Sequence, residues 1–561
     1  TLTEPSIWDY YIYANGHLGV QDIARWFGEP IFQNFGGRIE YDSILIIDQD
    51  SLKLHLETDL VGADFADLPE PIGKPIDEVR PLVLDLIIPD DVDDLEVVFN
   101  YNEWLDGKML MEGDYLTQGV ISNTGPLDYK EDIGIYVDVE FDFIDIEYWV
   151  PYIMDAQELN ETNPYNIVWP ELPEGTPTVD ERIKSVVLKT NSALAGSTYF
   201  YDLNATMVQN EIGWVIDYKT VESEGQIGVP FSDFEPVIIG VDYLALTDKN
   251  YPDTEEEIDP DAPVFDLLAD AMSPKEIPIM AIDIRQISYE DINYGSWQLK
   301  LDPYEKGVVI SDIRGIINGV EAKGNLNWFV DESENHVSSM KMELMTPNTT
   351  QTLKAFRAPP ALEAAQTKVE LALNWKGSPY LFSGSVANGT LKVDIDDGVI
   401  KQLPDDVGPA VGLFKFIGLL NASKIFSRIS LDFTDIMSSG QSFDSMRAEV
   451  VLNDGVATIS KDRKFTMDSS SLRFSGYGDY NMINDNLNMR GQIIVPFSST
   501  IATVGLLTGI AAPPAAAIIF FSEKIFKKGL EKLTTWHFDI VGNINDLDSL
   551  YPDVKHGGLK E

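Results

Sequence analysis

The sequence predicts a mainly β protein whose strands form an elongated, twisted antiparallel repeating β-groove with a hydrophobic trough. Three observations support this fold class. Apolar and acidic residues alternate in several short runs, turn signals separate these runs, and few segments show the 3.6-residue period of a helix. Apolar residues make up 44% of the 561 positions, which excludes a disordered chain.

The clearest strand pattern lies between residues 137 and 143. Val and Phe occupy every second position there, with Asp or Glu between them, so one face is apolar and the other is acidic. At Ile144 the phase changes by one residue, which predicts a β-bulge or a strand break. The same alternation recurs at 369–375, 391–395 and 429–433, and turn signals lie at Asp397 with Gly398 and at Asp454 with Gly455.

Strands of this kind make a sheet that is dry on one face and wet on the other. The sequence holds too few further strands or amphipathic helices to cover all of the dry face, so we expect the sheet to curl and leave a trough. The alternative is a set of closed β-sandwiches. The residues expected to line the groove are Val369, Leu371, Leu373, Leu391, Val393, Ile395, Ile429, Leu431 and Phe433.

Helical patterns are few. Helices are expected at 20–27, 264–272, 353–365 and 410–420. The stretch 497–535 is expected to form an apolar and amphipathic helical hairpin interrupted by Pro513 and Pro514. The second helix of this hairpin has one apolar and one basic side, as interfacial helices do. The prolines argue against a straight transmembrane span, and a lid on the end of a β structure is the alternative. The residues expected to contact a membrane are Ile518, Ile519, Lys524, Ile525, Phe526, Lys527 and Lys528.

The composition excludes several classes of function. The formal net charge of −52 argues against a nucleic-acid partner, because a polyanion would be repelled. The absence of cysteine excludes disulfides, thiolate metal sites and cysteine nucleophiles. The five histidines are scattered, and neither a nucleophile elbow nor a phosphate-binding loop is present. We therefore expect no enzyme, no cofactor and no metal site.

Two alternatives to that expectation stay open. The acidic stretch 248–263 could bind calcium, although its carboxylates lack the spacing of a defined loop. An acidic pair such as Asp138 and Asp142 could act in glycan hydrolysis, although such pairs are expected by coincidence among 92 carboxylates.

Polar, proline-containing connections suggest domain boundaries near residues 170 and 255. The expected division is a β-groove segment at 1–170, a second at 171–255, a C-terminal β-groove at 256–496, the helical hairpin at 497–535, and a final strand and tail at 536–561.

A series of short motifs occurs in the order found in one known family. They lie at 375–379, 391–398, 412–416, 429–436, 442–444, 453–455, 475–476 and 524–534, with 68–71, Lys74, 81–82 and 210–229 upstream. Together they resemble the C-terminal periplasmic portion of the YhdP family, which consists of AsmA-like proteins of the Gram-negative cell envelope. The sequence departs from the family pattern at 468–471, 480–486 and 543–550, where local turns are expected to differ.

This resemblance implies a periplasmic, bridge-like lipid transfer protein that moves phospholipid between the inner and outer membranes and so serves outer membrane biogenesis. It implies phospholipid and both membranes as partners, other envelope proteins as candidate partners, and no catalytic residues. Because the chain starts at Thr1 without a signal peptide, we expect a fragment whose inner-membrane anchor is absent. The alternative is a structural or adhesive β-rod of the envelope without lipid cargo.

Overall fold

A computed structural model describes residues 10–20, 22, 36–48, 51–65, 68–89, 94–112, 115–149, 182–196, 198–232, 234–250, 266, 268–269, 272–355, 362–400, 441–470, 473–494, 535–543 and 553–556. These residues form 28 strands and few helical elements, so the predicted mainly β class is confirmed. The chain divides into two compact units, the first made of 1–232 with 238–256 and the second of 233–237 with 257–561.

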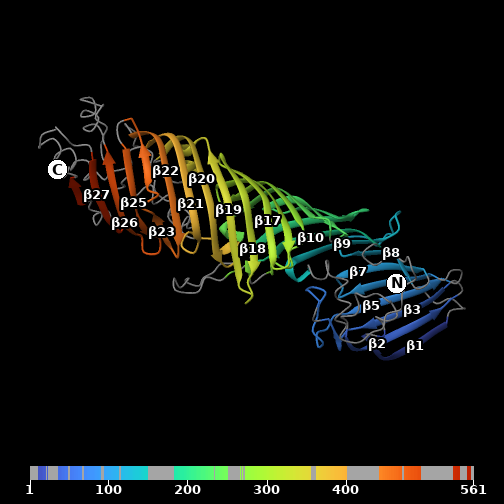
Figure 1. Ribbon diagram of the computed structural model, residues 1–561. Coiled ribbons are helices and arrows are strands. Elements are labelled where there is room, and N and C mark those ends of the chain that lie inside the picture. The colour runs from blue at the N-terminus through green and yellow to red at the C-terminus, as the bar shows by residue number, and fades with distance from the viewer. Residues whose placement is uncertain are drawn as a thin grey trace. The chain divides into compact units, whose positions relative to one another are not determined.

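The first unit contains a sheet in which neighbours along the chain are mostly neighbours in space (Figure 1). From β1 to β8 the pairing is antiparallel, with the two-residue β4 beside the start of β2 instead of between β3 and β5. The elements are β1 (Tyr10–Gly19), β2 (Gly36–Ile47), β3 (Ser51–Thr58), β4 (Ala63–Asp64), β5 (Leu82–Pro89), β6 (Asp94–Tyr101), β7 (Leu105–Glu112), β8 (Tyr115–Ser122), β9 (Ile135–Asp145), β10 (Ile183–Ala195), β11 (Thr198–Gln209), β12 (Gly213–Lys219), β13 (Ser223–Pro230), β14 (Val237–Leu246) and the turn η3 (Asp248–Asn250).

Strand β9 departs from the predicted antiparallel order. It pairs in parallel with β8 on one side and with β10 on the other. A parallel neighbour requires the chain to cross back to the same end of the sheet. Residues 123–134 make this crossing between β8 and β9, and Tyr129 within them donates a hydrogen bond to Glu96 at 3.4 Å. The sheet is therefore mixed, and the expectation of a wholly antiparallel sheet is wrong here.

The phase change at Ile144 is confirmed by burial, but the β-bulge expected there is not found, because the register of β9 with β10 is unshifted at Ile144 and β9 continues to Asp145. Val139 is buried, whereas Phe143, which shares its alternation, is 45% exposed. Ile144 is 5% exposed and lies in a cluster with Phe141 and with Ala193 of β10. The two neighbouring strands therefore change phase together, so the apolar face continues past this point.

The second unit contains a sheet whose pairings are all antiparallel (Figure 1). The short strands β23 and β24 both pair with β22 on one side and with β25 on the other, so together they take the place of one strand. The elements are β15 (Met280–Tyr289), β16 (Ile292–Tyr304), β17 (Gly307–Ile317), β18 (Val320–Val330), β19 (His336–Thr346), α5 (Thr349–Ala355), β20 (Leu362–Lys376), η4 (Pro379–Leu381), β21 (Asn388–Ile400), β22 (Gln441–Asn453), β23 (Val456–Ile459), β24 (Phe465–Asp468), β25 (Arg473–Asn481), β26 (Asn486–Ile494), β27 (Thr535–Asn543) and β28 (Asp553–His556).

The two predicted Asp-Gly turns have different outcomes. Asp454 and Gly455, with φ of 46° and 77°, connect β22 to β23 as a tight hairpin, as predicted. Asp397 and Gly398 lie inside β21 instead, so the turn predicted there is wrong. Asp397 has a φ of 47°, in the left-handed region that Asp tolerates, and the register of β21 with β20 and β22 continues unshifted past it.

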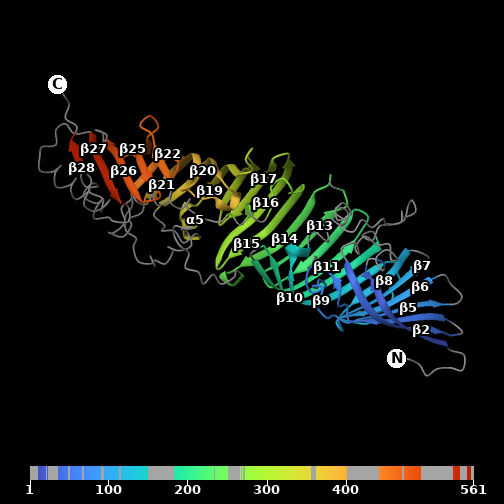
Figure 2. The same cartoon turned by 90° about the horizontal axis from the view of Figure 1, so that it is seen from below.

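The predicted helix at 353–365 is shorter than expected. Helix α5 ends at Ala355, and β20 already begins at Leu362. Pro359 and Pro360 lie between them, and proline cannot continue a helix because it lacks the N–H donor. Figure 2 shows α5 beside β19 and β20.

The predicted hairpin at 497–535 lies outside the described residues except for Thr535, which begins β27. Within the described part of the chain, no helix combines the length and the apolar character needed to cross a bilayer.

Candidate functional site

One row of directly opposed residues crosses the second unit from β15 to β27. Each member is the register partner of the next, and every member is apolar, glycine or tyrosine. Because opposed residues in a sheet share a face, the row shows one apolar face that runs across the unit. Its members are Met280, Leu301, Ile310, Leu326, Met340, Leu373, Gly389, Leu452, Ala457, Tyr480, Leu487 and Gly542.

The opposite face of the same sheet is charged. One row on that face is Lys323, Glu343, Glu370, Lys392 and Glu449, which are also successive register partners. The Lys368 ammonium lies 2.9 Å from the Glu343 carboxylate and 2.8 Å from that of Glu370. These hydrogen bonds raise the pKa of Lys368, and Lys368 lowers the pKa of Glu370. The sheet is thus amphipathic, with a hydrated outer face.

The apolar face of the second unit is filled in one part and partly open in another. Leu373 and Leu452 are 3% and 1% exposed, and residues from β20 to β26 form one buried cluster around them. From β15 to β19, by contrast, Ile310, Leu326 and Met340 are only half-buried. Helix α5, with seven residues, is the longest helix described in this unit. Leu268 and Ile277, from the described part of the segment before β15, pack against Leu301, Val308 and Trp328.

The first unit has an apolar face of the same kind. A row of register partners crosses it from β1 to β10, and every member is apolar or glycine. A second row continues from β9 to β14. The first row is Ile12, Leu45, Leu54, Leu86, Val97, Met109, Gly119, Ile135 and Ile183, and the second is Val139, Leu188, Ala205, Tyr218, Gly225 and Val241.

A segment between β3 and β5, residues 59–81, covers one end of this face; we call it the strap. Its apolar side chains and those at the nearby ends of β6 and β7 form one buried cluster. The short β4 attaches the strap to the sheet, because Ala63 pairs with Gly37 of β2. The clustered residues are Leu60, Ala63 and Phe65 of the strap, and Tyr101 and Leu105 of the sheet.

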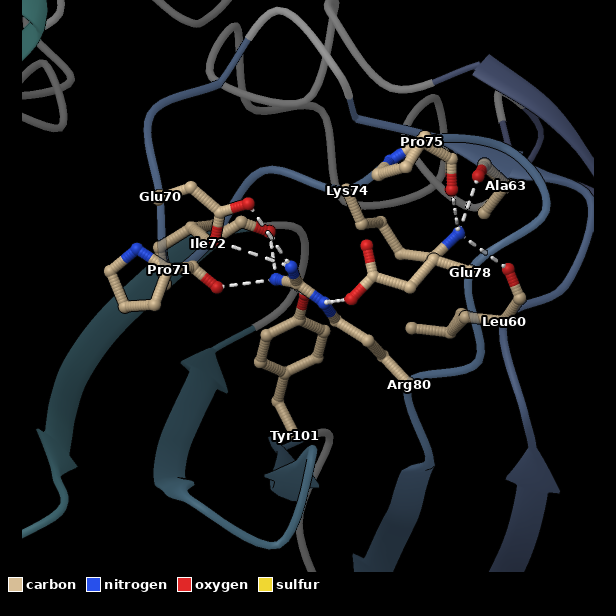
Figure 3. Close-up of polar contacts among 10 residues, drawn as sticks. All are labelled: Leu60, Ala63, Glu70, Pro71, Ile72, Lys74, Pro75, Glu78, Arg80 and Tyr101. Atoms are coloured by element: carbon tan, nitrogen blue, oxygen red, sulfur yellow. Dashed lines mark hydrogen bonds and ion pairs between the residues drawn. The ribbon is translucent and has the colours of Figure 1, made fainter.

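The strap is held in shape by a buried lysine (Figure 3). Lys74 is 1% exposed, and its ammonium donates hydrogen bonds to the carbonyl oxygens of Leu60 at 3.0 Å, Ala63 at 2.7 Å and Pro75 at 2.9 Å. Burial lowers the pKa of Lys74 because it disfavours the charged form. All three ammonium protons are used, so this lysine joins both ends of the strap and is not free to bind a ligand.

Arg80 joins the end of the strap to β6 (Figure 3). Its guanidinium donates to the carboxylate of Glu78 at 2.8 Å, to the carbonyl oxygen of Pro71 at 2.5 Å and to the Tyr101 hydroxyl at 3.1 Å. The Tyr101 hydroxyl in turn donates to the carbonyl oxygen of Ile72 at 2.8 Å. Burial opposes the charge on Arg80, but the hydrogen bonds with Glu78 and Tyr101 outweigh it and raise the pKa of Arg80.

The family model described as "YhdP protein" matches residues 9–546, which is nearly the whole chain. The chain belongs to the YhdP family.

One curated relative is the protein named "Intermembrane phospholipid transporter YhdP" of Escherichia coli (strain K12), which is 23% identical over 258 residues. The match covers 45% of this chain and 19% of that protein, so this chain corresponds to only a small part of its length.

Six of the predicted groove residues of this YhdP-family chain are described, and the structure brings them together. Leu371 of β20 faces Leu391 of β21, and Val369 faces Val393. All six are buried, between 1% and 7% exposed, within the cluster that spans β20 to β26. The described residues are Val369, Leu371, Leu373, Leu391, Val393 and Ile395, whereas Ile429, Leu431, Phe433 and the seven predicted membrane-contact residues lie outside the described part of the chain.

Sequence reasoning missed the half-buried part of the apolar face. The signal was present, because Met340, Met342 and Leu344 alternate with Lys341 and Glu343 in the sequence. Sequence reasoning also noted Lys74 only as part of a family motif, and it missed Arg80 altogether. The carbonyl partners of these two residues arise from the folded path of the strap and leave no local pattern.

Within the described ranges, no group of three or more His, Asp or Glu side chains is placed to hold a metal ion. The acidic stretch 248–263 lies mostly outside those ranges, so the calcium alternative stays untested.

Proposed function

We propose that this chain binds phospholipid by its acyl chains along the apolar face and forms part of a periplasmic, bridge-like path between the inner and outer membranes. The observation that carries the proposal is the apolar row from β15 to β27, in which no member bears a charge. Membership of the YhdP family and the printed name of the E. coli relative support phospholipid as the cargo.

The free energy of acyl-chain transfer explains why such a face is needed. Each methylene exposed to water costs about 0.8 kcal/mol, so two chains of about sixteen carbons cost on the order of 20 kcal/mol. An apolar face that replaces water around these chains removes most of this cost, while the headgroup stays in solvent. The charged outer face of the sheet keeps the protein hydrated.

The apolar row favours movement of a phospholipid along the face over tight binding at one place. It contains no charged side chain that could hold a headgroup at one place, so successive positions offer an acyl chain similar contacts. No catalytic step enters this proposal. The acidic outer surface would repel anionic headgroups and therefore supplies no direction for transport.

In this proposal, the predicted groove residues continue the same apolar face. We propose that the residues of β20 and β21 named above line it together with Ile429, Leu431 and Phe433. We also propose that Ile518, Ile519, Lys524 to Lys528 and their helical hairpin contact a membrane, with other envelope proteins as candidate partners at the ends.

A substitution on the half-buried part of the face tests the proposal. Met342 of β19 faces Gly324 and Leu371, and Met342→Arg places a charge on the apolar face. We expect this variant to lower transfer of a fluorescent phospholipid between liposomes at least tenfold and to co-purify with less lipid.

Lys341→Gln is the matched control. Lys341 precedes Met342 in β19, and its side chain is exposed on the opposite face of the sheet. It should leave transfer unchanged, and circular dichroism should show that both variants are folded. Wild-type transfer by a folded Met342→Arg variant would refute the proposal. A β-rod without cargo would show neither transfer nor bound lipid in any variant.

A further inference from the structure

The strap and the first apolar row occupy opposite ends of the sheet in the first unit. Tyr101 and Leu105, which the strap covers, lie at the end of β6 and the start of β7. Val97 and Met109 of the row lie four residues away from them along those strands, on the same face, because the two pairs share the alternation. The strap therefore divides the apolar face into a covered half and a second half.

Among the described residues of the first unit, no segment like the strap lies over the second half. The cluster there contains Leu95, Val97 and Met111 with half-buried neighbours, and all of its members belong to β5, β6, β7 or β8. Exposure increases toward β1, since Leu86, Leu54 and Leu45 are half-buried and Ile12 is 53% exposed. Apolar residues that stay this accessible on an otherwise buried face indicate a place for an apolar guest.

The covered half is closed to such a guest. Leu105 and Val139 are 8% and 7% exposed, and strap residues contribute to the same cluster. The strap cannot leave without breaking the contacts of Lys74 and Arg80. Its closure is therefore a fixed part of the fold.

We propose that acyl chains of phospholipid bind the first unit only on the uncovered half, across Ile12, Leu45, Leu54 and Leu86, and that the strap is the wall that confines them there. This inference rests on the proposed function and adds the path that the acyl chains take across the first unit. The four residues lie on adjacent strands, so they span about 14 Å at the usual spacing of strands. None of them is polar, so the site recognises the chain of the lipid and not its headgroup.

Cysteine protection tests this route, because the chain contains no cysteine and each introduced thiol is unique. We would prepare the full-length variants Leu54→Cys, Leu86→Cys, Leu105→Cys and Val139→Cys, with Met342→Cys in the second unit as a reference. Each is treated with N-ethylmaleimide after delipidation, and again after loading from vesicles of phosphatidylethanolamine and phosphatidylglycerol.

We expect Leu54→Cys and Leu86→Cys to react readily without lipid and at least tenfold more slowly with it. Leu105→Cys and Val139→Cys should react slowly in both states. Circular dichroism should show native β content for each variant, and two covered positions are used so that the test does not depend on one.

Two results would overturn the inference. One is lipid-dependent protection at Leu105→Cys and Val139→Cys equal to that at Leu54→Cys. The other is protection of Met342→Cys but not of Leu54→Cys or Leu86→Cys. A different failure, in which lipid protects neither these positions nor Met342→Cys, would contradict the proposed function itself.

Discussion

Lys74→Met is the substitution that most directly weakens the strap. Methionine keeps an unbranched apolar stem but removes the ammonium, so the carbonyl oxygens of Leu60, Ala63 and Pro75 lose their buried donor. Each hydrogen bond contributes about 1 kcal/mol net, so the loss is about 3 kcal/mol. Because each 1.4 kcal/mol is a factor of ten, we expect the strap to open about 100-fold more often.

Amide hydrogen exchange measures this opening directly. The Gly62 amide donates to the Ile76 carbonyl at 2.8 Å, and the Arg80 amide donates to the Asp59 carbonyl at 2.9 Å, both within the strap. These amides should exchange about 100-fold faster in Lys74→Met, in line with the loss of about 3 kcal/mol, while amides of β10 and β11 should be unchanged.

Lys219→Met is the matched control, because Lys219 is exposed and its ion pair with Glu224 lies at the surface. It should leave strap exchange unaffected. If a folded Lys74→Met variant exchanges its strap amides at the wild-type rate, then the three carbonyl contacts do not hold the strap, and the reasoning is refuted.

Three further predictions concern other parts of the fold. Burial lowers the pKa of His55, but its hydrogen bond with Asp85 at 2.6 Å contributes to a net raised pKa, so this pair stabilises fully below about pH 6.5 and less as the pH rises through the raised value. Urea unfolding should show this pH dependence, and His55→Gln should remove it. Trp328 is 2% exposed, so Trp328→Ala should cost about 3–5 kcal/mol in chemical unfolding, and an unchanged midpoint would count against a packed core there. A Cβ on Gly107 would lie 2.1 Å from the Phe99 ring, so Gly107→Ala should destabilise by about 1–3 kcal/mol, and less in a Phe99→Leu background if the ring is the cause.

Local periodicity predicted the strands but not their neighbours. The alternation at 369–375 and 391–395 identified β20 and β21, and the phase change at Ile144 was found because burial follows the two-residue period. The parallel pairings of β9 left no such signal, because the side-chain alternation of a strand is the same whichever way its neighbour runs.

Short motifs failed where tertiary contacts chose between two local structures. An Asp-Gly pair forms a hairpin at Asp454 but lies inside a continuous strand at Asp397, where the ring of Phe443 occupies the space beside Gly398. The strap could not be predicted either, since Lys74 looks like an ordinary charged residue until the fold brings the carbonyls of Leu60 and Ala63 to it beside that of Pro75.

The central claim is that the apolar face holds phospholipid by its acyl chains, and the amount of phospholipid bound to the purified chain tests it most directly. Lipid would be extracted and quantified by mass spectrometry after washing in detergent-free buffer at low salt and at about 1 M salt, where the Debye length is about 3 Å. We predict at least one phospholipid per chain at both salt concentrations, because the contacts are apolar. A folded chain without phospholipid, or with lipid that high salt removes, would contradict the account.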